Sequence, residues 1–175
     1  IRAMTWQEYA LELATVAAKK SKDPWRQVGA CLLRHDNTVA GIGFNGFPSG
    51  MDEDWSDRDK RRMLVCHAEQ NALRYVKPEE CSLIAVTLLP CNDCLKTIAS
   101  YGIRQVVYRD IYERDPSTLE LASAFKIDVI QLHKPEMTSY WDHSVRPSQF
   151  VVKENGREIH RGCYKEGEKL LGINK

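Results

Sequence analysis

The stretch His67-Ala68-Glu69, followed later in the chain by Pro90-Cys91-Asn92-Asp93-Cys94, supplies three metal-ligand side chains and one additional carboxylate. His67, Cys91 and Cys94 form a three-ligand set for zinc, and such a set leaves the fourth tetrahedral position open for water. Zinc lowers the pKa of that water toward neutrality. Glu69 is then available to carry a proton between the water and a substrate. The pattern predicts a catalytic metal site with one Zn²⁺ per chain.

The hydrophobic pattern around these residues indicates an α/β fold. The expected elements are, in order, a helix over residues 5–20, strands over 27–34 and 38–44, a helix over 66–76, a strand over 82–89, a helix over 91–100, a strand over 104–108, a helix over 117–125 and a strand over 127–132. This order predicts a three-layer α/β/α sandwich around a mixed sheet of roughly five strands. The metal ligands would lie in the first turns of two helices, where the helix dipole favours thiolates.

Length and charge limit the class of protein. The length of 175 residues suits one compact domain. The chain has 25 Lys+Arg and 24 Asp+Glu, so it lacks the excess of basic residues that is typical of proteins that bind long nucleic acids. We see no apolar run that could cross a bilayer and no signal-peptide pattern, and the cysteines outside the ligand set suit buried, reduced thiols. We therefore expect a cytoplasmic protein with no membrane partner.

The last part of the chain carries a weaker structural signal. Asn155-Gly156 between two apolar runs predicts a small terminal hairpin. We assign residues 1–134 to the zinc-dependent domain. Residues 135–175 are expected to form a C-terminal extension that packs on this domain or on a neighbouring subunit.

In five segments the chain resembles the deoxycytidylate (dCMP) deaminases of the cytidine deaminase superfamily. A His-x-Glu stretch with a later Pro-Cys-x-x-Cys is the signature of zinc-dependent nucleobase deaminases. The similar segments are Ser21–Pro24 with Gln27–Cys31, the glycine-rich loop Gly41–Gly50, the two zinc segments Val65–Ala72 and Leu89–Cys94, and Asp110–Tyr112. Together they span roughly residues 5–132, and their order and spacing make the resemblance specific.

The resemblance implies a hydrolytic enzyme that converts dCMP and water to dUMP and ammonia in pyrimidine nucleotide metabolism. It implies that Glu69 is the catalytic proton carrier and that the zinc ligands are those given above. It also implies substrate contacts by Asn45, Ala68 and Tyr112. Many members are hexamers regulated by dCTP and dTTP, so a homo-oligomer with nucleotide effectors is expected. Candidate contacts to phosphate or effector are Lys22, Arg26, Arg61 and Arg62.

Each assignment has a plainer alternative. Cys91 and Cys94 alone would also fit a redox pair or half of a structural zinc site. Asn45 would also fit a loop residue with a left-handed backbone, and Tyr112 a half-buried aromatic side chain. The four cationic side chains would also fit a solvated charged face.

Departures from the family pattern leave the exact substrate open. Met51 stands where many members carry a cysteine, the insert over residues 52–63 begins with acidic residues, and the tail from Phe150 extends past the usual end. The alternatives are deamination of dCTP, a nucleoside, a purine base or a tRNA adenosine, and a catalytically silent module that binds zinc or nucleotides. Intact Glu69 argues against the silent module, and the small net charge argues against tRNA.

Overall fold

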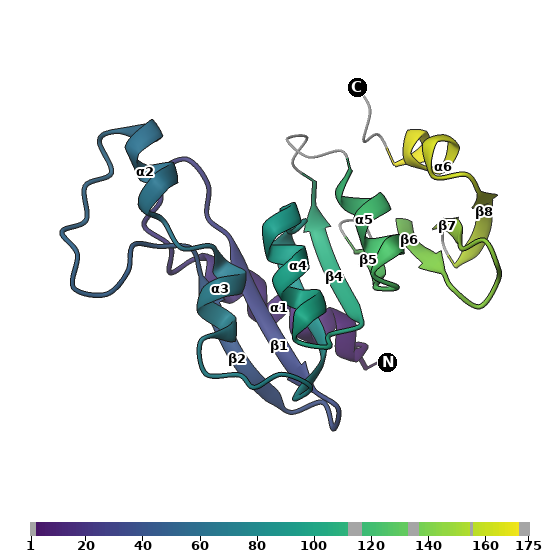
Figure 1. Ribbon diagram of the computed structural model, residues 1–175, viewed down its shortest axis with the longest axis horizontal. Coiled ribbons are helices and arrows are strands. Elements are labelled where there is room, and N and C mark those ends of the chain that lie inside the picture. The colour runs from purple at the N-terminus through teal and green to yellow at the C-terminus, as the bar shows by residue number, and fades with distance from the viewer. Residues whose placement is uncertain (1–2, 112–116, 133–136, 155, 172–175) are drawn as a thin grey trace.

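The computed structural model describes residues 3–111, 117–132, 137–154 and 156–171. Its central sheet has five strands in the order β2-β1-β3-β4-β5 (Figure 1). β1 (Gly29–Arg34) pairs antiparallel with both β2 (Val39–Phe44) and β3 (Cys81–Leu88). β4 (Gln105–Asp110) pairs parallel with β3 and with β5 (Asp128–Gln131). The predicted mixed, five-stranded sheet is confirmed.

Helices cover both faces of this sheet. α1 (Trp6–Ala18) crosses behind it in Figure 1, whereas α3 (Ala68–Leu73) and α4 (Asn92–Ser100) lie in front. Because side chains alternate along a strand, β1 sends Cys31 and Leu33 to the cluster under α1 and Ala30 and Leu32 to the other cluster. α5 (Thr118–Ala124) also packs in this second cluster. The predicted α/β/α sandwich is therefore confirmed.

The helix ends follow local sequence signals. Thr5 and Glu8 form a capping box at the start of α1, with hydrogen bonds of 3.0 and 3.1 Å between each side chain and the other residue's backbone N–H. α2 (Arg58–Leu64) was not predicted, because none of its seven described residues is buried and the segment has no apolar periodicity. Its N-cap, Asp57, accepts hydrogen bonds from the N–H groups of Asp59 and Lys60, both at 3.0 Å.

The C-terminal residues build a second, smaller sheet. β6 (Met137–Asp142), β7 (Gln149–Glu154) and β8 (Arg157–Gly162) pair antiparallel in that order, and α6 (Tyr164–Leu170) follows. β7 and β8 are the predicted hairpin, although residue 155 lies outside the described residues. β6 and α6 were not predicted.

Aromatic side chains connect this small sheet to the main core. Trp141, Phe150 and Tyr164 contact one another, with ring centroids 5.2 to 5.9 Å apart. All three belong to the hydrophobic cluster that also contains Tyr108 and Leu119. The predicted boundary at residue 134 lies outside the described residues, so the division into 1–134 and 135–175 stays a prediction.

The cysteines outside the ligand set meet the expectation of buried thiols only in part. All six cysteines are free thiols, and Cys31 and Cys81 are buried. Cys163 is exposed, so the prediction of a buried thiol is wrong there, because this residue caps α6 at the surface. Within the described residues, no helix has both the length and the apolar character needed to cross a membrane.

Candidate metal centre and pocket

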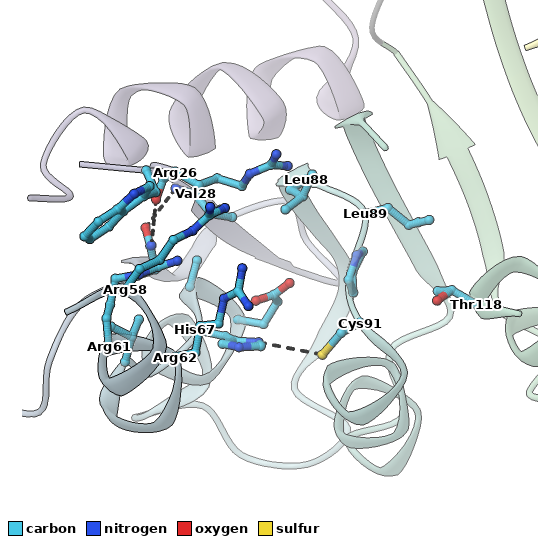
Figure 2. A pocket seen from close by; sticks show the side chains of 16 residues that line it. Arg26, Val28, Arg58, Arg61, Arg62, His67, Leu88, Leu89, Cys91 and Thr118 are labelled. Atoms are coloured by element: carbon cyan, nitrogen blue, oxygen red, sulfur yellow. Dashed lines mark hydrogen bonds between the residues drawn. The ribbon is translucent and has the colours of Figure 1, made fainter. Parts of the chain in front are cut away.

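The three predicted metal ligands lie together at the N-terminal ends of two helices. His67 is the N-cap of α3, Cys91 is the N-cap of α4, and Cys94 lies in the first turn of α4. The Nδ1 atom of His67 lies 3.3 Å from Cys94 Sγ and 3.7 Å from Cys91 Sγ, and all three ligand atoms lie within 4.8 Å of one another. Figure 2 shows the His67 ring directed at Cys91. Ordinary Zn–N and Zn–S bonds at a tetrahedral ion separate N from S by about 3.6 Å, so the set fits zinc.

The protonation of the two sulfurs differs because they share a hydrogen bond. The hydrogen bond from Cys94, with a further one from His67, lowers the pKa of the Cys91 thiol to about 4. The same Cys91–Cys94 hydrogen bond, together with burial, raises the pKa of Cys94. The hydrogen bond to Cys91 raises the pKa of His67. The low pKa favours the thiolate form of Cys91. Zinc binds cysteine as a thiolate, so metal binding would displace the proton that remains on Cys94.

Glu69 lies next to this ligand set but is not part of it. It belongs to the first turn of α3 and is 5% exposed. Burial raises the pKa of its carboxyl group. A carboxyl group with a raised pKa, within reach of a metal-bound water, suits transfer of protons in both directions.

A pocket of about 320 Å³ opens beside the ligand set. Its lining combines Glu69 and the zinc ligands His67 and Cys91 with apolar side chains from the end of β3. Four arginines also line it: Arg26 from the segment before β1, and Arg58, Arg61 and Arg62 from α2 (Figure 2). The pocket thus brings a cationic wall close to a metal centre, which suits a ligand that carries both a polar ring and an anionic group.

The structure brings most, but not all, of the other predicted site residues to this pocket. Asn45, Ala68, Arg26, Arg61 and Arg62 line it. Lys22 does not, because its Nζ atom forms an exposed ion pair of 3.0 Å with Glu53 outside the lining. Tyr112 lies outside the described residues.

The sequence analysis did not name several of the lining residues as site residues, among them Trp25, Arg58 and Thr118. Arg58 had a usable signal, since Arg58, Arg61 and Arg62 are three and four positions apart and share one face once the segment is helical. Thr118 had none, because its place depends on a hydrogen bond of 2.8 Å to Asn92, which lies 26 positions away.

Asn45 is held by a buried polar network. Its Oδ1 accepts a hydrogen bond of 2.8 Å from Val28 N–H, and its Nδ2 donates to Asp23 Oδ2 at 3.2 Å and to the carbonyl of Arg26 at 2.9 Å. The left-handed backbone is wrong for Asn45, since the described non-glycine residues with positive φ are Asn37, Glu79 and Lys126. Both amide donors are engaged, so Oδ1 is the atom left to accept from a ligand hydroxyl.

Comparison with known proteins places these residues in context. Residues 4–110 match the family model described as the cytidine and deoxycytidylate deaminase zinc-binding region. Deoxycytidylate deaminase of Mus musculus is 36% identical over 143 residues, covering 75% of this chain and 80% of the mouse protein. The Homo sapiens enzyme is 39% identical over 116 residues, covering 60% of this chain and 65% of the human protein. The crystal structure of dCMP deaminase from cyanophage S-TIM5 in complex with dCMP and dUMP has a TM-score of 0.65 and 26% identity, covering 74% of this chain and 100% of the phage chain.

Proposed function

The chain belongs to the cytidine and deoxycytidylate deaminase family, and from this we propose that it hydrolyses dCMP to dUMP and ammonia. One observation carries the proposal: buried Glu69 lies beside the His67, Cys91 and Cys94 set, in a pocket lined by arginines. The phage enzyme that binds dCMP and dUMP shares this fold. Zinc, when bound by the three ligands, supplies a water molecule whose pKa is lowered toward neutrality.

Glu69 is the residue that moves protons in this scheme. Its carboxylate takes a proton from the water and delivers it to N3 of the cytosine ring. The oxygen of that water forms a bond to C4 of the ring. Glu69 then carries the remaining proton of this oxygen to the amino group, the C4–N bond breaks, and ammonia leaves as the C4 carbonyl of dUMP forms. Burial keeps the carboxyl group in a low-dielectric site, and its raised pKa makes the carboxylate a stronger base, which favours taking the proton from the water.

Three of the pocket arginines suit the substrate phosphate. Arg26, Arg58 and Arg62 line the pocket, and guanidinium groups bind phosphate through paired hydrogen bonds. Arg61 is committed to a buried ion pair with Asp23. Asn45 and Ala68 border the base and sugar in this proposal, with Asn45 accepting from a sugar hydroxyl, and Tyr112 completes the site by its resemblance to the family.

We also propose that the protein is a homo-oligomer that responds to dCTP and dTTP. The family resemblance suggests a hexamer. Exposed apolar side chains support subunit contacts: Ile42 and Phe44 on the edge strand β2 are 48% and 37% exposed, and Met63 and Tyr75 are 84% and 87% exposed. Light scattering of the purified protein tests the oligomeric state, and a monomer with and without each nucleotide would contradict it. The response to dCTP and dTTP is tested by adding each nucleotide to the initial-rate measurements, and unchanged rates would contradict it.

An initial-rate panel tests the proposed reaction. Ammonia release by the zinc-loaded protein is measured with deoxycytidine, dCMP and dCTP, with dCTP and dTTP added in turn as effectors. A purine base and a tRNA that carries the target adenosine are included as further substrates. We expect the highest kcat/KM for dCMP. Faster turnover of dCTP or of deoxycytidine would assign a different substrate, and turnover of a purine base or a tRNA adenosine alone would assign a different deaminase. Nucleotide binding without any ammonia release would indicate a silent binding module.

A further inference from the structure

α2 carries three of the four pocket arginines, although none of its seven residues is buried in the core. Arg61 and Leu64 are partly buried, and the Arg61 side chain, which is 11% exposed, pairs with a fully buried Asp23 carboxylate. Arg61 also lies over the Trp25 ring, 5.1 Å from its centroid. This one side chain attaches the middle of α2 to the domain.

Asp23 is the centre of the attachment. Its Oδ1 accepts hydrogen bonds from the backbone N–H groups of Trp25, at 2.9 Å, and Arg26, at 3.2 Å. Its Oδ2 accepts from Asn45 Nδ2 at 3.2 Å and from Arg61 Nη1. A buried carboxylate with four donors is fully satisfied, and it fixes Arg61 relative to both Asn45 and the Arg26 backbone.

The other connections of this segment are weaker or lie at its end. Gly46 and Cys66 exchange backbone hydrogen bonds of 2.9 and 3.2 Å just after the helix. Lys22 and Glu53 form an ion pair before the helix, but their side chains are 70% and 42% exposed, and such pairs contribute little. Before the helix, the Phe47 and Trp55 rings also contact each other, with centroids 4.4 Å apart. Among the described ion pairs, the Arg61–Asp23 pair is the one that joins α2 itself to the domain, so we assign the orientation of α2 chiefly to Arg61.

We propose that Asp23 and Arg61 are positioning residues that set the preference of the pocket for a 5′-phosphorylated nucleotide over the nucleoside. The inference rests on the proposed function. The pair neutralises Arg61 and holds α2 so that Arg58 and Arg62 face the pocket beside Arg26. Releasing α2 disperses the cationic wall, while the zinc ligands and Glu69, on α3 and α4, keep their places.

The test compares two substrates across matched variants. Arg61→Met and Asp23→Asn each break the ion pair, whereas Arg61→Lys keeps the positive charge at position 61. The control is Lys60→Met, which removes a charge from the same helix at an exposed position outside the pocket lining. The readout is kcat/KM for dCMP divided by kcat/KM for deoxycytidine. We expect Arg61→Met to lower this ratio by about tenfold or more, mainly through the KM of dCMP, because charged contacts to the phosphate are lost. Arg61→Lys should recover part of the ratio, and Lys60→Met should leave it unchanged.

Equal losses on both substrates, or an unchanged ratio, would overturn the inference. The substrate ratio of Asp23→Asn is interpreted only if the circular dichroism spectrum and zinc content of this variant match those of the wild type. If they do not match, the substrate ratio of Arg61→Met alone tests the inference. Equilibrium binding of dUMP and deoxyuridine gives a second ratio that needs no turnover. If the wild type releases no ammonia from dCMP but prefers dUMP, and Arg61→Met loses that preference, the proposed function fails and the inference stands. Equal wild-type affinity for dUMP and deoxyuridine would refute the inference itself.

Discussion

The Nδ1 atom of His67 lies 3.3 Å from the Sγ atom of Cys94, although 27 positions separate the two residues in the sequence. The contact exists because α3 and α4 pack on the same face of the sheet with their N-terminal ends toward one site. Each helix contributes an N-cap residue to the ligand set. The metal centre is therefore built by the packing of two helices on the sheet.

His67→Ala is expected to remove most of the bound zinc and, with it, the deaminase activity. Two thiolates would remain, and a tetrahedral site with two protein ligands binds zinc much more weakly. Metal analysis of the purified variant by mass spectrometry checks the loss. Cys163→Ser, which removes an exposed thiol outside the ligand set, is the matched control and should keep its zinc. A zinc content in His67→Ala equal to that of the wild type would contradict the assignment.

Glu69→Gln is expected to keep zinc and fold but to lose turnover by at least about a hundredfold, because the amide cannot exchange a proton with water and ring. The same metal analysis, together with ammonia release, separates chemistry from metal loss. Glu166→Gln on α6 makes the same chemical change at an exposed position and should be fully active. Near-normal deamination by Glu69→Gln would remove Glu69 from the mechanism.

The sequence was sufficient for the parts of the fold that bury apolar side chains. β3, for example, is a continuous apolar run with most of its residues buried, and it pairs on both sides. α2 was not predicted, because most of its residues are charged and none is buried, so the segment has no apolar periodicity. The site followed the same rule. Zinc ligands have a fixed local spacing, whereas the Asp23–Arg61 pair joins residues 38 positions apart through a contact that no local pattern encodes.

Asp142→Asn is expected to reduce the loss of stability in acid. Hydrogen bonds from Ser144 and then Arg161, the latter at 2.7 Å, lower the pKa of Asp142 to about 2. The folded-state pKa lies below the unfolded value of about 3.9, so the ionised Asp142 stabilises the folded protein above about pH 4. This contribution disappears as the pH falls toward 2 and the carboxylate is protonated. Urea unfolding midpoints between pH 6 and pH 2.5 check this. The difference between wild type and Asp142→Asn should shrink as the pH falls, and a constant difference would contradict the linkage.

Phe150→Ala is expected to lower the free energy of unfolding by about 3–5 kcal/mol, because Phe150 is fully buried between Trp141 and Tyr164. Ile159→Ala on β8, where the side chain is 40% exposed, is the control and should change it by less than about 1 kcal/mol. If residues 135–175 pack on the domain as proposed, calorimetry should show one transition that shifts as a whole. Two transitions, with only one shifted, would indicate that the extension folds separately.

Gly43→Ala is expected to damage the metal centre from a distance. Gly43 lies on β2 directly under α3, and an added Cβ would lie 2.4 Å from the backbone nitrogen of Ala72 and 2.8 Å from the carbonyl oxygen of Ala68. Both are backbone atoms, so α3 must move, and His67 and Glu69 move with it. Overpacking of this kind costs about 1–3 kcal/mol of stability.

Gly46→Ala is the matched control, since a Cβ there meets nothing within 4 Å. Zinc affinity, measured by competition with a chelator, should fall in Gly43→Ala and stay at the wild-type value in Gly46→Ala. Unchanged zinc affinity in Gly43→Ala, alongside reduced stability, would show that α3 adjusts without displacing its first turn.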